Sequence, residues 1–291
     1  DDSDPLAQST DHDSYTQKKP WQKIIILLAG PFANFAVAFL LYFGTAQIGT
    51  PLSPLFNYSA YLPATVGDFS ETSPAKAAGI RQGDTILAIN GQKIANWEDV
   101  GETIQRQHGT ILFTVVRNQQ HLNVHVTPTL ETQTNRFGEQ VQRKIIGITP
   151  YVTNAPLSFG MIESVQFAWN ETLHASTLIF QSVQKLITGA VPASQLGGVV
   201  TIVDVTAKAS ETGIIALFLF TALISVNLGV LNLLPIPALD GGHIVFNLYE
   251  MIRGKAPGEE VMYRLTVAGW LILLSLMTLG LYNDINRLFL G

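Results

Sequence analysis

The 291 residues include no cysteine, and charged residues make up only 13% of them. The lack of cysteine excludes a disulfide-stabilised fold and a zinc site built from thiolates. Soluble domains carry roughly a quarter charged residues, whereas 47% of this chain is hydrophobic. The mild net charge of −5, without a basic stripe, argues against nucleic acid as a partner. Composition therefore favours a protein whose main partner is a lipid bilayer.

Three apolar runs, at about 24–46, 214–234 and 265–282, are the longest features of the chain. Each is close to the roughly 20 residues that a helix needs to cross a bilayer. Almost no charge lies inside them, so buried helices of a large soluble core are the weaker interpretation. We predict spanning segments at 23–48, 211–243 and 265–283, after a polar cytoplasmic segment at 1–22. Residues 1–17 are expected to be disordered, and the chain to begin partway through a longer protein.

Basic residues near the ends of these runs predict the orientation. They are Lys18, Lys19 and Lys23 before the first run, and Arg253, Lys255 and Arg264 between the second and third. Cytoplasmic loops are enriched in Lys and Arg, so both groups are expected in the cytoplasm. With three spans, the C-terminus and the insert at about 49–205 are then expected outside.

The insert begins with the signals of a compact mixed α/β domain at about 60–130. Ser73 can cap a short helix that exits at Gly79, and Asn96 followed by Asp99 predicts a second helix. Asn90-Gly91 is a strong hairpin signal. Strands are expected at 85–89, 111–117 and 121–127. One short helix, one longer helix and several strands fit a PDZ-like fold.

In residues 156–190 the apolar and polar side chains are spaced with the period of a helix, so they would lie on different faces of that helix. The segment is too polar to span a bilayer and suits one or two amphipathic helices on the membrane surface. A helix packed on the preceding domain is an equally good interpretation.

The sharpest chemical signal is NLGVLNLLPIPALDGGH, residues 227–243. Asp240 lies at the edge of an apolar run, where an ionisable residue is costly and usually functional. Pro235 and Pro237 break the helix and leave carbonyls unpaired, which membranes tolerate only in protein-buried or wet cavities. The glycines that follow allow close approach of backbone or ligand. The pattern indicates a carboxylate in a shielded, hydrated pocket, although an ordinary interfacial aspartate capping a loop stays open.

This segment resembles the LDG-type motif of the site-2 proteases, the intramembrane zinc metalloproteases. The layout is similar to the PDZ-containing bacterial branch that cleaves anti-sigma factors and remnant signal peptides. Residues 30–34 (GPFAN) resemble the GPxxN element of that family, and the 186–189 end (LITG) of the amphipathic segment resembles its membrane-associated helices. The resemblance runs from Trp21 onward. It implies a polytopic α-helical protein of the bacterial inner membrane with an inserted, periplasmic PDZ-like domain.

The resemblance also implies zinc as cofactor and single-span membrane proteins as substrates. Asp240 would be the third zinc ligand, beside two histidines of an HExxH helix whose glutamate acts as base. Four further residues match family positions implicated in holding the substrate: Asn227, Asn232, Pro235 and Pro237. Asn side chains can bond an unwound substrate strand, or alternatively join helices. Gly30 and Asn34 would allow close helix packing, and the PDZ-like domain would act as a size filter or bind C-terminal peptides.

The chain departs from the family because it contains no HExxH. His121 and His125 lack the glutamate, and in a strand they lie roughly 13 Å apart, so they are expected on the surface. His243 is interpreted as a polar interface residue rather than a donor to the site. The missing motif is expected upstream of Asp1, which makes this chain catalytically incomplete. The alternative is a non-enzymatic, membrane-anchored PDZ adaptor or pseudoprotease. A periplasmic serine protease with a PDZ domain is disfavoured, because the sequence has no GxSGG-like loop and three spans are too many.

Overall fold

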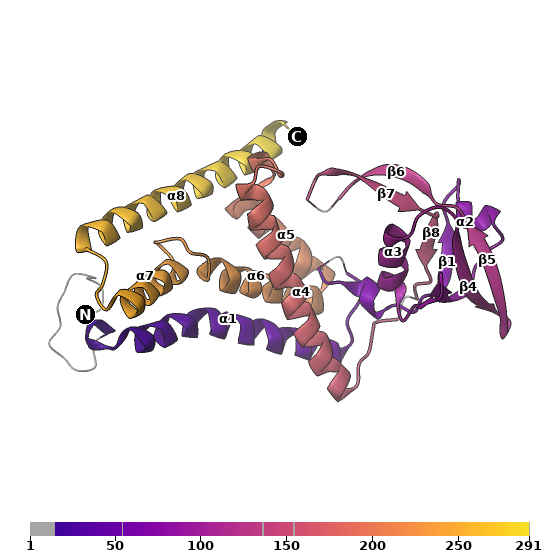
Figure 1. Ribbon diagram of the computed structural model, residues 1–291, viewed down its shortest axis with the longest axis horizontal. Coiled ribbons are helices and arrows are strands. Elements are labelled where there is room, and N and C mark those ends of the chain that lie inside the picture. Colours follow the sequence, from indigo (N-terminus) through magenta and orange to yellow (C-terminus); the bar gives the residue numbers. More distant parts are fainter. Residues whose placement is uncertain (1–14, 54, 136, 154, 291) are drawn as a thin grey trace. The chain divides into compact units, whose positions relative to one another are not determined.

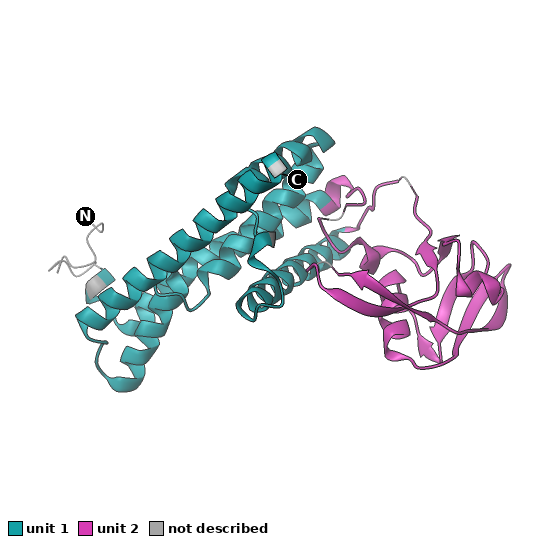
Figure 2. Ribbon diagram, turned by 90° about the horizontal axis from the view of Figure 1, so that it is seen from above, with its two compact units in different colours: residues 1–45, 161–291 teal, residues 46–160 magenta. Residues whose placement is uncertain are grey.

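The computed structural model describes residues 15–53, 55–135, 137–153 and 155–290. The chain divides into two compact units, residues 1–45 with 161–291 and residues 46–160 (Figure 2). Most of the polar segment predicted at 1–22, namely 1–14, lies outside the described residues.

Three helices of the first unit match the apolar runs: α1 (Pro20–Ile48), α6 (Ile214–Asn232) and α8 (Glu259–Leu290) (Figure 1). By length and composition each could cross a membrane. Large apolar side chains point outward from them, for example Phe32 and Met277, which are 72% and 64% exposed. Such exposure would be costly in water and is favourable against lipid tails.

Three more helices complete this unit, α4 (Met161–Ile187), α5 (Val199–Thr212) and α7 (Asp240–Arg253). Short 3-10 turns lie at Tyr15–Gln17 and Ala193–Gln195. One face of α4 is buried and packs on α6, and Phe167 meets the Tyr42 ring of α1 edge-on at 6.3 Å. The amphipathic segment predicted at 156–190 thus forms one main helix that belongs to the helical unit. Its opposite face is apolar and exposed at Ile162 and Trp169.

A side chain near the C-terminal end of α8 caps the N-terminus of α5. The Asp284 carboxylate accepts hydrogen bonds from the Gly198 and Thr201 backbone N–H groups, both at 3.0 Å, and from the Thr201 hydroxyl. An N-cap is usually supplied by the residue before the helix, and here Gly198 has no side chain to supply it. Asp284 therefore caps α5 from a helix more than 80 residues away in sequence.

The second unit is built from short strands and two helices. Its elements are a 3-10 turn (Tyr58–Tyr61), β1 (Val66–Phe69), α2 (Pro74–Ala77), β2 (Thr85–Ile89), β3 (Gln92–Lys93), α3 (Trp97–Arg106), β4 (Ile111–Arg117), β5 (Gln120–Val126), β6 (Thr129–Thr134), β7 (Gln140–Ile145) and β8 (Ile148–Pro150). The sheet order is β3-β2-β4-β5, with antiparallel pairs β1-β8 and β6-β7 beside it. This unit extends beyond the predicted 60–130 range at both ends.

Local signals in the sequence formed the expected structures here. The Ser73 hydroxyl accepts the Lys76 N–H at 3.1 Å, and the Asn96 side chain accepts the Asp99 N–H at 3.0 Å. Asn90 and Gly91 have φ of 46° and 80°, the left-handed values that a two-residue hairpin needs. The predicted strands at 85–89 and 111–117 are confirmed, and the third is displaced by one residue.

The core of the second unit is mainly apolar, and an ion pair lies at its edge. Val66, Ile86 and Phe113 are buried in a cluster that also includes Ile146. At its edge the fully buried Asp84 carboxylate accepts two bonds from the Arg117 guanidinium, at 2.8 and 2.7 Å. Asp84 raises the pKa of Arg117 through these bonds. The pair ties β4 to the turn before β2.

Candidate metal centre

Asp240 is placed by a break between two helices. α6 ends at Asn232, and α7 begins at Asp240 itself. Between them Pro235 and Pro237 lack the N–H group that a continuing helix requires. The segment turns through bonds from the Ile236 N–H to the Leu234 carbonyl, at 2.7 Å, and from the Leu239 N–H to the Ile236 carbonyl, at 2.8 Å. The predicted helix break is confirmed, whereas a new helix starting at Asp240 was not foreseen.

The two glycines after Asp240 press the first turn of α7 onto this segment. A Cβ at Gly241 would lie 2.2 Å from the Leu234 carbonyl oxygen, and one at Gly242 would lie 2.3 Å from that of Ile236. Such distances are far below van der Waals contact, so no larger residue fits without movement. The expectation that these glycines allow close backbone approach is confirmed. The two glycines therefore fix the position of the backbone from which the Asp240 side chain extends.

The Asp240 side chain lies against α1 at the GPxxN element. A Cβ built on Gly30 would be 3.5 Å from the Asp240 Oδ2 atom. α1 and α6 also approach closely, since a Cβ at Gly229 would lie 3.0 Å from the Phe35 ring. The carboxylate thus sits beside a helix more than 200 residues away in sequence, next to the first residue of the GPxxN element.

The Asp240 carboxylate is half-buried and makes no hydrogen bond or ion pair with any other residue in the described ranges. It lies at the N-terminus of α7, where the helix dipole favours negative charge. A carboxylate that makes no hydrogen bond or ion pair in the described part of the chain, inside an apolar helical unit, suits a metal ion. Zinc accepts such an oxygen ligand, but a catalytic site needs three protein ligands.

Within residues 15–53, 55–135, 137–153 and 155–290, no group of three His, Asp or Glu side chains is arranged to hold a metal. His121 and His125 are exposed on β5, as predicted for surface strand residues. The chemistry of the Asp240 carboxylate fits one zinc ligand, and its assignment as a ligand stays a prediction.

His243 is one turn further along α7. Its ring meets Phe246 edge-on at 5.9 Å and lines a cavity of about 130 Å³ with Tyr15, Lys23 and Asn247. The Asn247 amide, which is buried, donates to the His243 carbonyl at 2.8 Å and toward the Tyr15 hydroxyl at 3.5 Å. Burial raises the pKa of the Tyr15 phenol, and the bond from Asn247 opposes this shift. The role of His243 stays a prediction.

The side chains of Asn227 and Asn232 are half-buried on α6. Neither makes a hydrogen bond with another residue that the structure describes, so neither joins two of these helices. Pro235 is exposed, whereas Pro237 lies by α8, where a Cβ at Gly269 would be 3.4 Å from its carbonyl carbon. Their substrate-binding roles stay predictions, and the two amides have unused donors and acceptors.

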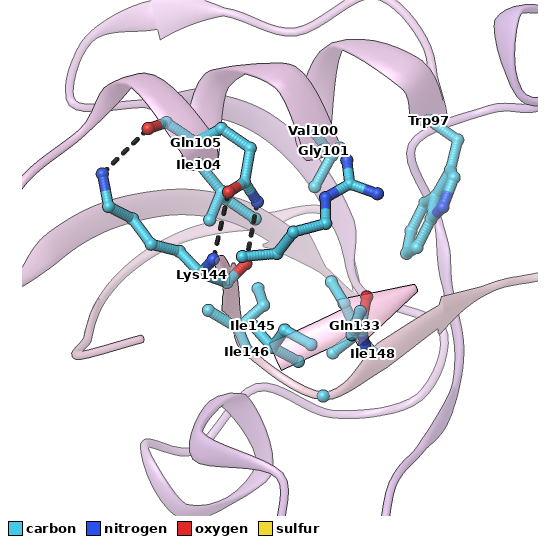
Figure 3. A pocket seen from close by; sticks show the side chains of 12 residues that line it. Trp97, Val100, Gly101, Ile104, Gln105, Gln133, Lys144, Ile145, Ile146 and Ile148 are labelled. Carbon is cyan, nitrogen blue, oxygen red and sulfur yellow. Dashed lines mark hydrogen bonds between the residues drawn. The ribbon is translucent and has the colours of Figure 1, made fainter. Parts of the chain in front are cut away.

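The second unit contains a hollow of about 180 Å³ that sequence reasoning missed. It lies between α3 and the chain at 143–148 (Figure 3), and its apolar lining includes Val100, Ile104, Ile146 and Ile148. The signal that could have located it is the isoleucine cluster around Gly147, which interrupts a polar stretch.

Comparison with known proteins identifies the family of the chain. Residues 5–276 match the model of peptidase family M50. A Campylobacter jejuni protein whose name assigns it to the zinc metalloproteases is 40% identical over 290 residues, covering 99% of this chain and 75% of its own length. The regulator of sigma-W protease RasP of Bacillus subtilis is 34% identical over 279 residues, and the match spans 95% of this chain and 62% of RasP.

Among solved structures, the PDZ domain of a Listeria innocua SdrC-like protein aligns with 32% of this chain and 98% of its own. The identity is 20% and the TM-score 0.24. That score does not establish the fold of the second unit. The family match over nearly the whole chain, together with the 40% identity to the Campylobacter jejuni protein, leads to one conclusion: the chain belongs to peptidase family M50, the site-2 family of zinc-dependent membrane peptidases.

Proposed function

We propose that this chain forms the greater part of an intramembrane zinc metalloprotease that cuts the membrane segments of single-span proteins, such as anti-sigma factors or remnant signal peptides. One observation carries the proposal: the Asp240 carboxylate, held where a helix is broken, lies against Gly30 and has no protein partner among the described residues. Zinc, when bound, would polarise the scissile carbonyl and activate a water. Asp240 is its ligand from this chain.

The remaining assigned residues act on the substrate. A membrane helix must be unwound before water can attack it, and its exposed amides then need partners inside the membrane. Asn227 and Asn232 offer both donors and acceptors, and their side chains are unused within the described chain. Pro235 and Pro237 leave backbone carbonyls without helical donors, which are further acceptors for an extended substrate strand.

The proposed topology follows the basic residues. The chain would span a bacterial inner membrane three times, through α1, α6 and α8. The basic groups at 18–23 and 253–264 would then lie on the cytoplasmic side of that membrane. The second unit would then be periplasmic. Its strand order and α3 support a PDZ-like domain that either filters substrates by size or binds peptides in the hollow beside α3.

A pseudoprotease adaptor is the competing function, and the observation in its favour is that no group of three potential metal ligands lies within the described ranges. The two differ in metal content. If the protein is an enzyme, about one zinc ion per full-length protein is expected. If it is an adaptor, no zinc is expected.

The test uses the full-length protein, purified in detergent, and a single-span anti-sigma-factor substrate. Asp240→Asn should lower zinc content and reduce cleavage by on the order of 100-fold or more, since even the partners of metal ligands contribute 10–100-fold. Asp204→Asn is the matched control, because Asp204 is exposed on α5 and forms a surface ion pair with Lys208. Cleavage retained by Asp240→Asn would refute the ligand assignment.

A further inference from the structure

The cavity that His243 lines lies where the N-terminal end of α1, α7 and the start of α8 come together (Figure 1). It measures about 130 Å³. Its polar lining consists of Tyr15, Lys23, His243, Asn247 and Glu250. Its apolar wall includes Phe246, Pro257 and Met262. In the proposed topology these elements lie at the cytoplasmic surface of the membrane, at the level of the lipid headgroups.

α7 turns its polar face into this cavity and its apolar face outward. His243, Asn247 and Glu250 are spaced four and three residues apart, which places them on one side of the helix. On the opposite side Leu248 and Ile252 are 44% and 83% exposed. An outward apolar face is favourable for a helix at a bilayer surface. The inward polar face is favourable only if its groups find partners inside the cavity.

Lys23 and Glu250 carry opposite charges and line the same cavity, yet they do not pair. Both residues are half-buried. The Lys23 ammonium lies 5.8 Å from the centre of the Tyr15 ring, and it makes no hydrogen bond or ion pair with another described residue. The Glu250 carboxylate makes none within that part of the chain either. Two unpaired charges of opposite sign in one cavity suit a ligand that carries both signs.

Tyr15 and His243 add hydrogen-bond donors to the cation of Lys23. The Tyr15 oxygen is approached by the Asn247 amide at 3.5 Å, and its own proton is available for a further acceptor. Because burial raises the pKa of the Tyr15 phenol, the hydroxyl keeps this proton at neutral pH. The His243 ring nitrogens make no hydrogen bond with another described residue, and either protonation state of the ring offers an N–H donor. An ammonium, a hydroxyl and a ring N–H together suit a phosphate group.

The headgroup of phosphatidylethanolamine matches this set of groups. It carries a phosphate anion, which suits the donors, and a primary ammonium, which suits the Glu250 carboxylate. Phosphatidylglycerol has no cation to place at Glu250. The choline of phosphatidylcholine is a cation without N–H groups, so it cannot donate a hydrogen bond there. The apolar wall at Phe246 and Met262 suits the part of the lipid where the acyl chains begin.

We propose that this cavity binds the headgroup of phosphatidylethanolamine, with the phosphate at Lys23, Tyr15 and His243 and the ammonium at Glu250. The leaflet in which the lipid lies rests on the proposed topology, whereas the preference for this headgroup does not. The bound lipid joins the start of α1 to α7 and α8, and α7 is the helix that begins at Asp240. The lipid therefore stabilises the first unit.

The experiment measures lipid binding to the whole chain in detergent by native mass spectrometry. The probes are phosphatidylethanolamine, phosphatidylcholine and phosphatidylglycerol with identical acyl chains, and the soluble compound phosphoethanolamine. Phosphatidylethanolamine should bind about 10-fold tighter than the other two lipids, because its ammonium forms a charge-assisted hydrogen bond. It should also raise the unfolding temperature, as expected of a ligand that binds only the folded state. Phosphoethanolamine should bind at least about 10-fold more weakly than this lipid, because it buries no apolar surface.

Two variants separate the two halves of the headgroup. Glu250→Gln removes the charge that faces the ammonium, so the preference for phosphatidylethanolamine over phosphatidylglycerol should fall from about 10-fold to below about 3-fold. Lys23→Met removes the cation that faces the phosphate, so all three lipids should bind about 10-fold more weakly. Glu259→Gln and Lys19→Met are the matched controls, because both positions are exposed and lie outside the cavity lining. They should leave every affinity unchanged. Thermal unfolding without lipid checks that each variant is folded.

Equal binding of the three lipids, or an unchanged preference in folded Glu250→Gln, would overturn the site. Phosphoethanolamine that binds as tightly as the lipid would overturn the assignment to a lipid. The topology is tested apart from the site, because the chain has no cysteine and Lys255→Cys provides a single thiol for labelling. A thiol labelled from the periplasmic side would refute the proposed topology and leave the lipid preference standing. Neither measurement involves zinc or cleavage, so the protease proposal is tested separately.

Discussion

Enlarging Gly30 should displace the Asp240 carboxylate without weakening the helix that carries it. A Cβ at this position lies 3.5 Å from the Asp240 Oδ2 atom, an ordinary contact, so Gly30→Ala should be tolerated. Valine adds methyl groups about 1.5 Å beyond Cβ. In a helix its side chain has one strongly preferred rotamer and little freedom to turn away. A methyl group directed at the carboxylate would approach to about 2 Å, well inside the roughly 3.3 Å of a close C···O contact.

The carboxylate must therefore move by about 1 Å, a displacement that can reduce catalysis about 100-fold. We expect Gly30→Val to lose cleavage to about that extent and to bind less zinc, while Gly30→Ala keeps both. Gly is a poorer helix former than Val, so a weaker α1 cannot explain the loss. The assay compares cleavage of the single-span substrate, zinc content and thermal unfolding of the full-length protein.

Gly44→Val is the matched control, because Gly44 lies on the same helix and a Cβ there meets nothing within 4 Å. It should leave cleavage and zinc content unchanged. Full activity and zinc in Gly30→Val, or equal losses in both valine variants, would refute the placement of Asp240 against α1.

Three further predictions concern the second unit, the helix break and the substrate. Arg117→Met should lower the free energy of unfolding of the second unit by about 3–5 kcal/mol, because it leaves the buried Asp84 carboxylate without its cation. Unfolding in urea, monitored by amide exchange, measures this change. Gly242→Ala should lower the unfolding temperature and the zinc content together, since its Cβ would lie 2.3 Å from the Ile236 carbonyl oxygen. Asn232→Ala should reduce cleavage about 10-fold, as expected for the loss of a substrate hydrogen bond of about 1.4 kcal/mol, with zinc content unchanged.

Each of these has a control in the chain. Lys93→Met removes an exposed cation, Gly258→Ala adds a Cβ in open space, and Thr221→Ala alters an exposed polar position of α6. All three should behave like the unmodified protein. A stable Arg117→Met, an unchanged melting temperature in Gly242→Ala, or an Asn232→Ala variant with normal cleavage would each contradict its prediction.

Features set by neighbouring residues were predictable without a structure. The apolar runs became α1, α6 and α8 because membrane-type helices satisfy their backbone internally and need only length and composition. The Ser73 and Asn96 caps and the Asn90-Gly91 turn formed for the same reason, since each is closed within four residues. The helix break before Asp240 could be predicted because Pro235 and Pro237 lack the backbone N–H that a continuing helix needs.

Contacts between distant segments were decided by the tertiary structure. β8 and the hollow beside it depend on pairing with β1, about 80 residues earlier, which no local pattern announces. The start of α7 at Asp240 was hidden by prolines and glycines that resemble helix breakers; the glycines are used instead for close packing on residues 233–237. Above all, the position of Asp240 against Gly30 is a contact between segments 210 residues apart, which no local pattern indicates. Local propensity acts over a few residues, whereas a site assembled across 200 residues exists only once the helices have packed.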